Sequence, residues 1–486
     1  MASASGSGVA GPRYTDQLEV DVLDLGPKVS FSGRSLGPDE VIALEGVGTF
    51  SMVHLSRNLN DLIGRGKDVT KFSRKVHFES TRRGHASLTT SAIPFLEVRW
   101  CSRLLSMVVM GARFGSFLQE SQRRSEVTAD RMLVPAEVRG TALEGRVRDA
   151  LLANHAYYRE LLGRGIDLED ARYVLPLATA TSFFSASSLE SVLYAVLKVR
   201  HRIGLVTSEL EVYSGRLISL LSDLMPSLTG SRLAFSGPWT YYPVPDPLRE
   251  SDGVFSALFG DRVPEDAELV DIMTVGGVNR VLSQDGLRTA ERVYPAVQAV
   301  VLEAPSLVAY HQSIRHRSVP TAVESLVEAA DRALKEPERS VVVPPRLRSS
   351  EATISEFREK ALSMLELYES VREELGPAAA LYLVPQAVRI RTLRVYDLFN
   401  LLSPMGFVAT RTCSAAQWEE RAIAYRIWRE VERSVPELGR LMGEKCRHLG
   451  YCPEKEWCPI ILKYRRYDDE THRRFNEIQP KPSTDL

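Results

Sequence analysis

Four segments of the chain repeat apolar residues with the three-to-four-residue period of an amphipathic helix. They are residues 189–199, 205–221, 356–373 and 418–435. That period places the apolar side chains on one face, so each segment predicts a helix packed against a core. Gly376-Pro377 and Pro436 closely follow the last two segments, as expected where a helix ends.

Shorter runs of β-branched and aromatic residues predict strands at Val341–Val343 and Leu381–Val384. A longer apolar run, residues 300–309, fits either a helix or a buried strand. The proline-dense segment Ser236–Pro247 lies almost at the midpoint and predicts a linker or a wrapping arm. Two halves of similar size on either side of it suggest an internal duplication.

The charges of the chain are balanced, because 61 Lys and Arg oppose 62 Asp and Glu for a net charge of −1. This balance argues against a general nucleic-acid or membrane-surface binder, so an anion site must be a local cluster. No apolar stretch reaches the roughly 20 residues that span a bilayer. Residues 1–11 are rich in small residues and lack a signal pattern, which predicts a frayed tail and a cytoplasmic protein.

A cationic cluster follows the longer apolar run. His311–Arg317 holds two arginines, two histidines and an amide in seven residues. Guanidinium donors match phosphate oxygens in pairs and stay charged at any working pH, so the cluster suits a phosphate group. The alternative is a solvated face, which is the commoner outcome for an arbitrary basic triplet.

The two halves repeat one order of elements but divide the polar residues between them. In the first half an apolar stretch is followed by Arg113 and then by Ser121-Gln122-Arg123. In the second half the corresponding stretch is followed by Arg315-His316-Arg317. Further along, Leu175-Pro176 corresponds to Val384-Pro385. Random decay would remove motifs from either half without regard to function, so this division favours specialisation.

With these motifs in this order, the chain resembles the flavin-dependent thymidylate synthases, the ThyX family, in a tandem-duplicated form. The family signature is Arg-His-Arg, seven residues, Ser, one residue, Arg; the second half holds its first part and the first half the remainder. Three further family elements occur in order: Gly84–Ser87, Glu169–Pro176 and Arg411–Glu419.

The resemblance implies an α/β (α+β) chain of two ThyX-like lobes, each with a central β-sheet flanked by long helices. We place the lobes at residues 1–245 and 246–440, followed by a Cys- and His-containing extension and polar tail at 441–486. Sites of the family form between the chains of a homotetramer. Fused lobes therefore predict a homodimer that is a pseudo-tetramer.

The reaction that the resemblance implies is the reductive methylation of dUMP to dTMP, with methylenetetrahydrofolate as carbon donor and FAD reduced by NADPH as hydride source. Arg411 matches the arginine that stabilises the anionic pyrimidine, a preorganised-charge role. Residues that match contacts to FAD are His85, Ser87, Arg315, His316, Arg317 and Asn400. Residues that match contacts to dUMP are Gln312, Ser121, Arg123 and Arg172, with Arg315 also facing dUMP.

Each of these residues also has a plainer interpretation. The histidines could be ordinary hydrogen-bonded residues, Ser121 a helix N-cap, and Arg172 and Arg411 partners in surface ion pairs. The motifs also depart from the family, which has Asn, Glu, Tyr, Arg and Arg at the positions of Leu118, Gln119, Arg124, Val327 and Leu381. These departures favour a rival, a degenerate paralogue that binds flavin or nucleotide or serves as a non-catalytic scaffold. Our main hypothesis is one composite site in which the two halves supply complementary residues.

The cysteines give a weaker signal. Cys446, His448, Cys452 and Cys458 could supply four soft ligands to zinc, but their spacing is not that of a paired zinc knuckle. A local disulfide and plain buried thiols are the other interpretations. No metal ligand is assigned from the sequence.

Overall fold

The computed structural model describes residues 13–31, 33–235 and 237–478, without the side chains of 284–289 and 476. The predicted tail at residues 1–11 lies outside this range. The chain forms two compact units. Unit 1 is Met1–Asp252 with Ser325–Val388, and unit 2 is Gly253–Glu324 with Arg389–Leu486.

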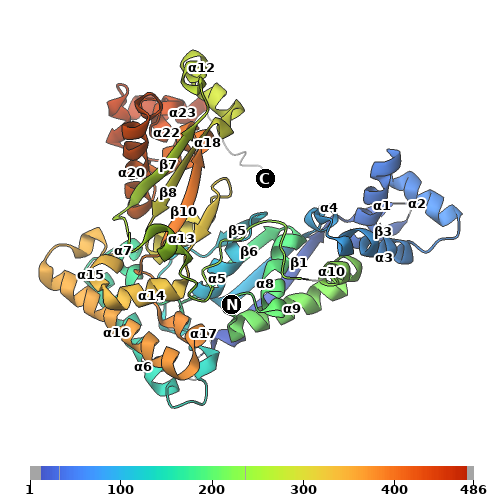
Figure 1. The fold of residues 1–486 in the computed structure, drawn as a ribbon, viewed down its shortest axis with the longest axis horizontal. Coiled ribbons are helices and arrows are strands. Elements are labelled where there is room, and N and C mark those ends of the chain that lie inside the picture. Colours follow the sequence, from blue (N-terminus) through green and yellow to red (C-terminus); the bar gives the residue numbers. More distant parts are fainter. Residues whose placement is uncertain (1–12, 32, 236, 479–486) are drawn as a thin grey trace, which may run out of the picture. The chain divides into compact units, whose positions relative to one another are not determined.

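Each unit contains a four-stranded antiparallel sheet, and the two sheets have the same strand order (Figure 1). In unit 1 the order is β1 (Glu19–Gly26), β4 (Ile93–Ser102), β6 (Ala180–Ser187), β5 (Gly115–Gln119). In unit 2 it is β7 (Ala267–Thr274), β8 (Val297–Glu303), β10 (Thr392–Asp397), β9 (Thr321–Val323). The first strand of each sheet has a register shift at a matching place, between Val22 and Asp24 in β1 and between Leu269 and Asp271 in β7. The order and the shared irregularity confirm the internal duplication.

Helices cover the sheets, and most of the predicted ones are present. Those of unit 1 are α1 (Pro38–Ser51), α2 (Leu55–Gly64), α3 (Val69–Ser80), α4 (Ala86–Ser91), α5 (Arg103–Met110), α6 (Glu144–Gly163), α7 (Leu168–Ala171), α8 (Leu189–His201), α9 (Ser208–Leu224), α10 (Pro226–Leu233), α14 (Leu326–Lys335), α15 (Pro337–Ser340), α16 (Glu351–Leu375) and α17 (Pro377–Ala380), beside the hairpin of β2 (Val29–Phe31) and β3 (Arg34–Leu36). Those of unit 2 are α11 (Val254–Phe259), α12 (Val278–Arg292), α13 (Leu307–Ser313), α18 (Leu398–Leu402), α19 (Phe407–Arg411), α20 (Trp418–Ser434), α21 (Pro436–Gly439), α22 (Lys445–Leu449) and α23 (Asp469–Ile478). None of the helices described is long and apolar enough to cross a membrane.

The structure confirms three of the helix predictions, as α8, α16 and α20. The fourth predicted helix is present as α9, but it begins later in the sequence. Helix α9 begins at Ser208, later than predicted, because the side chain of Thr207 caps it by accepting from the Leu210 N–H at 3.2 Å. In unit 2, α20 packs on the sheet, where Val301, Tyr396 and Ile427 belong to one buried core. The apolar face of α20 therefore serves the role its period predicts.

The two short strand predictions are wrong. Residues 381–383 form a 3-10 turn, and Val341 makes a single bridge, to Val388. Both runs are buried, and their backbone groups bond to other irregular segments, as when the Tyr382 carbonyl accepts from the Ala178 N–H at 2.7 Å. Their β-branched and aromatic content thus reflects burial, which a short run does not distinguish from strand formation.

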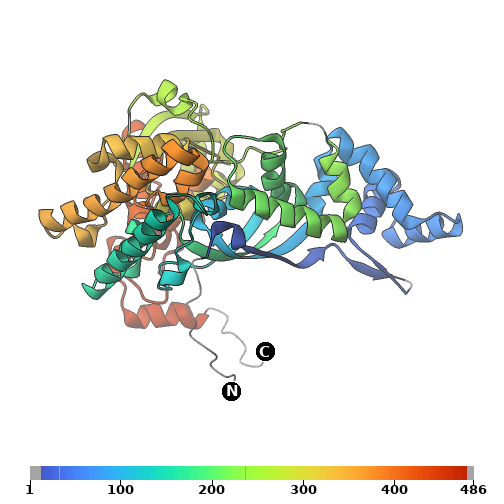
Figure 2. The same ribbon diagram turned by 90° about the horizontal axis from the view of Figure 1, so that it is seen from below.

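Matching segments of the two halves pack together within unit 1. Helices α6 and α16 lie side by side (Figures 1 and 2), and the Arg164 guanidinium donates to both carboxylate oxygens of Glu356 at 2.7 and 2.9 Å. Further along each half, Pro176 bridges to Pro385. The equivalent segments of both halves thus share one helical layer.

The proline-dense segment is a wrapping arm. Within its described part, the Asp246 carboxylate is buried and accepts from Tyr194 at 2.7 Å and from Lys198 at 2.6 Å, both on α8. This contact fixes the arm against unit 1. The segment predicted as a polar tail also has structure, because α23 occupies Asp469–Ile478 within it.

Candidate active site

The second-half cluster is built at the end of α13. The Ser306 hydroxyl caps this helix by accepting from the Ala309 N–H at 3.2 Å. The Glu419 carboxylate accepts in turn from both the N–H and the hydroxyl of Ser306, each at 2.6 Å. These bonds tie the start of α20 to α13, the helix that carries Gln312 and leads into Arg315–Arg317.

His316 and Arg411, far apart in sequence, are in direct contact. The Arg411 Nε–H donates to His316 Nε2 at 2.9 Å. Because a guanidinium only donates, Nε2 must be the acceptor and the ring proton lies on Nδ1. Burial, and then the positive charge of Arg411, lowers the pKa of His316 to about 2. The imidazole is therefore neutral at physiological pH and orients the arginine.

Four guanidinium groups surround this imidazole and act against its protonation, those of Arg411, Arg394, Arg315 and Arg317. Two of them are paired with buried carboxylates: Arg394 with Glu303 at 3.1 Å, and Arg411 with Glu420 at 3.2 Å. The Arg411 side chain remains a quarter exposed, so it is accessible from solvent. The plainer interpretation of Arg411 as a surface ion-pair partner does not hold, because its partner is buried.

Arg315, Arg317 and Gln312 complete the second-half group. Arg315 is exposed and Arg317 half-buried. Burial lowers the pKa of Arg317 to about 10, and the charge of Arg315 adds to the effect. The Gln312 side-chain nitrogen is buried and makes no hydrogen bond to any described residue. An anionic ligand would offset the crowded positive charges and could accept a hydrogen bond from the Gln312 amide.

Asn400 is buried and fully engaged by the protein. Its amide oxygen accepts from the Ser318 hydroxyl at 2.9 Å, and its amide nitrogen donates to Asp397 at 2.8 Å and to the Ser318 carbonyl at 3.3 Å. Ser318 directly follows Arg317, so Asn400 holds the turn that carries the triplet. The contact to FAD that the resemblance implies gains no support from this geometry.

The first-half residues Ser121, Arg123 and Arg172 form a group around Glu169 in unit 1. The Arg123 Nε lies 3.0 Å from the Glu169 carboxylate, and the Arg172 Nε donates to the Glu169 carbonyl at 3.1 Å. The Ser121 hydroxyl accepts from the Arg123 N–H at 3.3 Å, in a turn that does not continue into a helix. The N-cap interpretation of Ser121 is therefore wrong, and Arg172 is buried instead of exposed.

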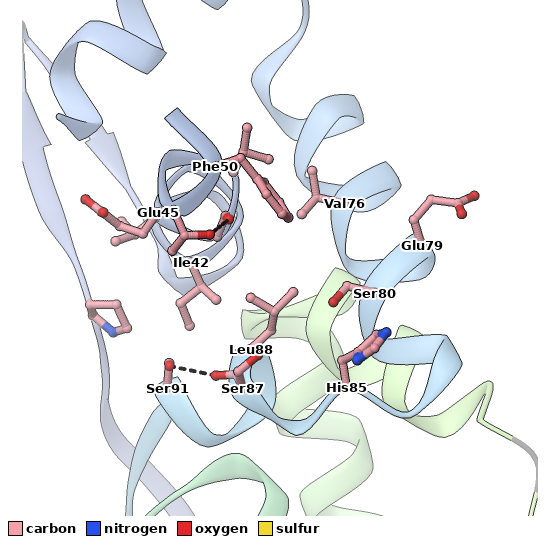
Figure 3. Close-up of a pocket in the computed structure, with 15 residues that line it drawn as sticks. Ile42, Glu45, Phe50, Val76, Glu79, Ser80, His85, Ser87, Leu88 and Ser91 are labelled. Carbon is pink, nitrogen blue, oxygen red and sulfur yellow. Dashed lines mark hydrogen bonds between the residues drawn. The ribbon is translucent and has the colours of Figure 1, made fainter. Parts of the chain in front are cut away.

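His85 and Ser87 line a cavity of about 820 Å³ in unit 1. Figure 3 shows the lining side chains on α1, α3 and α4, with Ile42, Phe50, Val76 and Leu88 supplying apolar surface. Both residues are exposed, His85 just before α4 and Ser87 in its first turn.

Three residues that the sequence did not single out as site residues support these groups: Glu169, Glu420 and Arg394. Glu169 and Glu420 each lie inside or beside a family motif, and proximity in sequence could have suggested them. Arg394 lies on a central strand, where no motif marks it. Its burial against Glu303 appears only in the folded chain.

The C-terminal cysteines are all free thiols, so the disulfide interpretation is wrong in this structure. Within the described chain no group of three or more His, Cys, Asp or Glu side chains is placed ready to coordinate a metal ion. Burial raises the pKa of Cys446 to about 12, and Glu444, Cys452, Cys458 and Cys413 add to the effect in that order. The thiols therefore lie close together, and Cys413 belongs with them.

Comparison with known proteins finds a family model that matches segments in both halves of the chain. A family model described as thymidylate synthase complementing protein matches residues 48–227 and 291–437. A flavin-dependent thymidylate synthase of Pyrococcus abyssi is 28% identical over 191 residues, which cover 37% of this chain and 72% of that protein. One from Sulfurisphaera tokodaii is 33% identical over 154 residues, 30% of this chain and 54% of that protein.

Among solved structures, the UMP/dUMP methylase PolB from Streptomyces cacaoi bound with 5-Br dUMP is 19% identical, with a TM-score of 0.37. The match covers 47% of this chain and 99% of that one.

Proposed function

Because the chain belongs to the family of thymidylate synthase complementing proteins, we propose that it catalyses the reductive methylation of dUMP to dTMP. Methylenetetrahydrofolate would donate the carbon, and FAD reduced by NADPH the hydride. The observation that carries the proposal is the crowding of Arg315, Arg317 and Arg411 around the neutral imidazole of His316. Such a cluster suits a nucleotide whose base gains negative charge during reaction.

In this proposal the first-half group binds the phosphate of dUMP. Ser121 offers a hydroxyl, and Arg123 and Arg172 offer guanidinium donors that Glu169 already holds near one another. The Glu169 carboxylate pairs with Arg123, while its backbone carbonyl accepts from Arg172. A dianionic phosphate would offer both guanidinium groups charge-assisted, paired hydrogen bonds. Glu169 would thus act as a placeholder that fixes the arginines before the substrate binds.

The second-half group would bind the base. Arg411 stabilises the anionic pyrimidine, and its position is fixed by two bonds, to His316 at 2.9 Å and to Glu420 at 3.2 Å. A charge that is already oriented does not have to reorganise as the reaction proceeds, which is the advantage of a preorganised site. The unpaired amide nitrogen of Gln312 would donate to the base or to the ribose.

The residues present fit a flavin. When bound, FAD would supply the hydride chemistry, while the protein provides binding and orientation. Arg315 and Arg317 offer the donors that a diphosphate requires. The largely apolar cavity of about 820 Å³ beside His85 and Ser87 has room for part of a flavin.

The division of motifs supports a composite site supplied by both halves. The second half has Val327 in place of the arginine of the Ser-x-Arg element, so it would depend on the first half for phosphate binding. The first half, with Gly111-Ala112 in place of the first two triplet residues, would depend on the second. Two fused chains would then form a homodimer equivalent to a tetramer, with half of its sites complete.

The test is direct. Purified protein should be yellow and should release FAD on denaturation. With dUMP, methylenetetrahydrofolate and NADPH it should form dTMP, measured by chromatography of the products. Protein that binds FAD but forms no dTMP from these substrates would contradict the proposed reaction.

A second candidate is a degenerate family member that binds flavin or nucleotide without making dTMP. The specific observation in its favour is the first-half motif. Leu118 is 71% exposed, and the amide of Gln119 donates to Ser106 at 3.2 Å, where the family has Asn and Glu. Binding of dUMP without product in the same assay would establish this candidate.

A further inference from the structure

Four of the five cysteines line one small cavity in unit 2, and this cluster has no part in the reaction proposed above. Cys413 comes from the loop between α19 and α20, and Cys446, Cys452 and Cys458 come from α22 and the loop after it. We propose that these four cysteines bind a single zinc ion through their thiolates. Four thiolates from separate segments around one point are the ligand set of a closed structural zinc site.

The two other candidate metal ligands of this segment are a carboxylate that is engaged elsewhere and an imidazole that is absent from the lining. Glu444 lines it, but its carboxylate already accepts from Tyr425 at 2.7 Å and from Lys463 at 3.0 Å. His448 does not line it. The sequence suggested His448 as the fourth ligand. In the proposed site Cys413 takes that place.

The backbone around the cysteines is suited to sulfur that carries negative charge. The Ala415 N–H faces the Cys413 sulfur, and the N–H groups of Glu454 and Cys458 face the Cys452 sulfur. Backbone donors of this kind orient thiolate ligands in the second shell of metal sites. The positive side chain of Lys445 also lines the cavity and would offset part of the charge of four thiolates.

The size of the cavity favours one ion over a cluster of several metals. It encloses about 10 Å³, the space of roughly one water molecule. The thiols are not in coordinating positions as they stand, so each would turn about its Cα–Cβ bond toward the cavity that it lines. Rotation about that bond moves the sulfur between staggered wells.

The surrounding segment also needs a stabilising element. Its core consists of Cys446, Cys452, Ile461 and Tyr467, with a few half-buried aromatic residues packed against them. A core of this size rarely holds a short segment together without a metal or a disulfide, and the cysteines here are free. Cys413 lies two residues after Arg411, so the ion would join the extension to the segment that carries this arginine.

The test measures metal, so it is independent of thymidylate synthesis. The full chain is purified without a histidine tag, and zinc, iron and acid-labile sulfide are determined. We expect about one zinc per chain, little iron and no sulfide. The variant Cys413→Ser should lose at least three quarters of the zinc. His448→Gln and Cys101→Ser, which alter residues outside the cavity, should retain it.

A titration of the unaltered protein covers the case in which Cys413→Ser does not fold. A mercurial reagent should release the zinc in proportion to about four thiols modified. Chain without zinc whose thiols all react at one rate would overturn the proposal. So would stoichiometric iron and sulfide, or a loss of zinc in His448→Gln that matches the loss in Cys413→Ser.

Discussion

The two sheets have the same strand order and the same hydrogen bonds at the start of the helix that follows the second strand, α5 in unit 1 and α13 in unit 2. They differ in the residues at the end of that helix. In unit 1 the Glu209 carboxylate accepts from the N–H and the hydroxyl of Ser102 at 2.7 and 2.5 Å, as Glu419 does from Ser306 in unit 2. Beyond that bond the first half has Gly111-Ala112, where the second has Arg315-His316. The two halves thus keep the same hydrogen-bonded frame but differ in the cationic residues that follow it.

The structure gives a physical reason why the triplet is absent from the first half. A Cβ atom on Gly111 would lie 2.7 Å from the Pro245 carbonyl, so the wrapping arm occupies the space that an arginine would need. The interior differs as well. The second-half sheet buries the Arg394–Glu303 pair, and at the same distance after the matching proline the first-half sheet has Ser185. In the proposed site the first half would therefore act as a scaffold and supply the residues that bind the phosphate.

The largest effect is expected from Arg411. Arg411→Ala should lower kcat for dTMP formation by about 10²–10³-fold, because it removes a preorganised charge from the site. The matched control is His201→Ala, since His201 precedes Glu209 by the interval that separates Arg411 from Glu419. Steady-state assays of both variants measure the difference. Equal activity of the two would contradict the assignment of the catalytic arginine to the second half.

A smaller effect is expected from Arg123. Arg123→Ala should raise the KM for dUMP by roughly tenfold or more, since a charge-assisted bond to phosphate is lost, and should change kcat less. Arg124, the exposed neighbour, provides the control Arg124→Ala. If Arg124→Ala weakened dUMP binding as much as Arg123→Ala, the phosphate group would be misassigned.

The closeness of the arm can be tested at Gly111. Gly111→Ala should lower the free energy of unfolding by about 1–3 kcal/mol, because its Cβ has no space beside Pro245. Gly215→Ala, on α9, meets no atom within 4 Å and should leave stability unchanged or raise it by up to about 1 kcal/mol. Urea unfolding curves measure both. A stable Gly111→Ala variant would show that the arm does not exclude the triplet.

The last effect concerns pH. Burial raises the pKa of Glu209 from 4.5 to about 8, against hydrogen bonds from Ser102 and Tyr382. An acid with a raised folded pKa contributes stability that is full below the unfolded pKa and is lost as pH rises through the folded one. The free energy of unfolding should therefore fall between about pH 4.5 and 8, by at most about 1.4 kcal/mol per pH unit.

Glu209→Gln, a neutral side chain of the same shape, should flatten that dependence. Glu211→Gln, which alters an exposed carboxylate on the same helix, should leave it unchanged. Unfolding curves recorded at several pH values compare the two variants. A dependence that persists unchanged in Glu209→Gln would mean that another group titrates.

Much of this organisation could be predicted from the sequence, because periodicity and motif order do not depend on distant contacts. The long helices, the duplication and the division of Arg315–Arg317 from Ser121 and Arg123 are of this kind. The buried runs at 341–343 and 381–384 were not predictable as irregular segments, since a short apolar run has no period. Arg394 and Cys413 were missed for another reason, because each acquires its role from residues brought near it only by folding.

The central claim is that two incomplete sets of residues form one site, and the stoichiometry of dUMP binding tests it most directly. Isothermal titration of the FAD-loaded chain should give one dUMP per chain. Either Arg123→Ala or Arg315→Ala, one from each half, should abolish or strongly weaken that single binding event. Two dUMP per chain, or full binding that survives in either variant, would contradict the shared site.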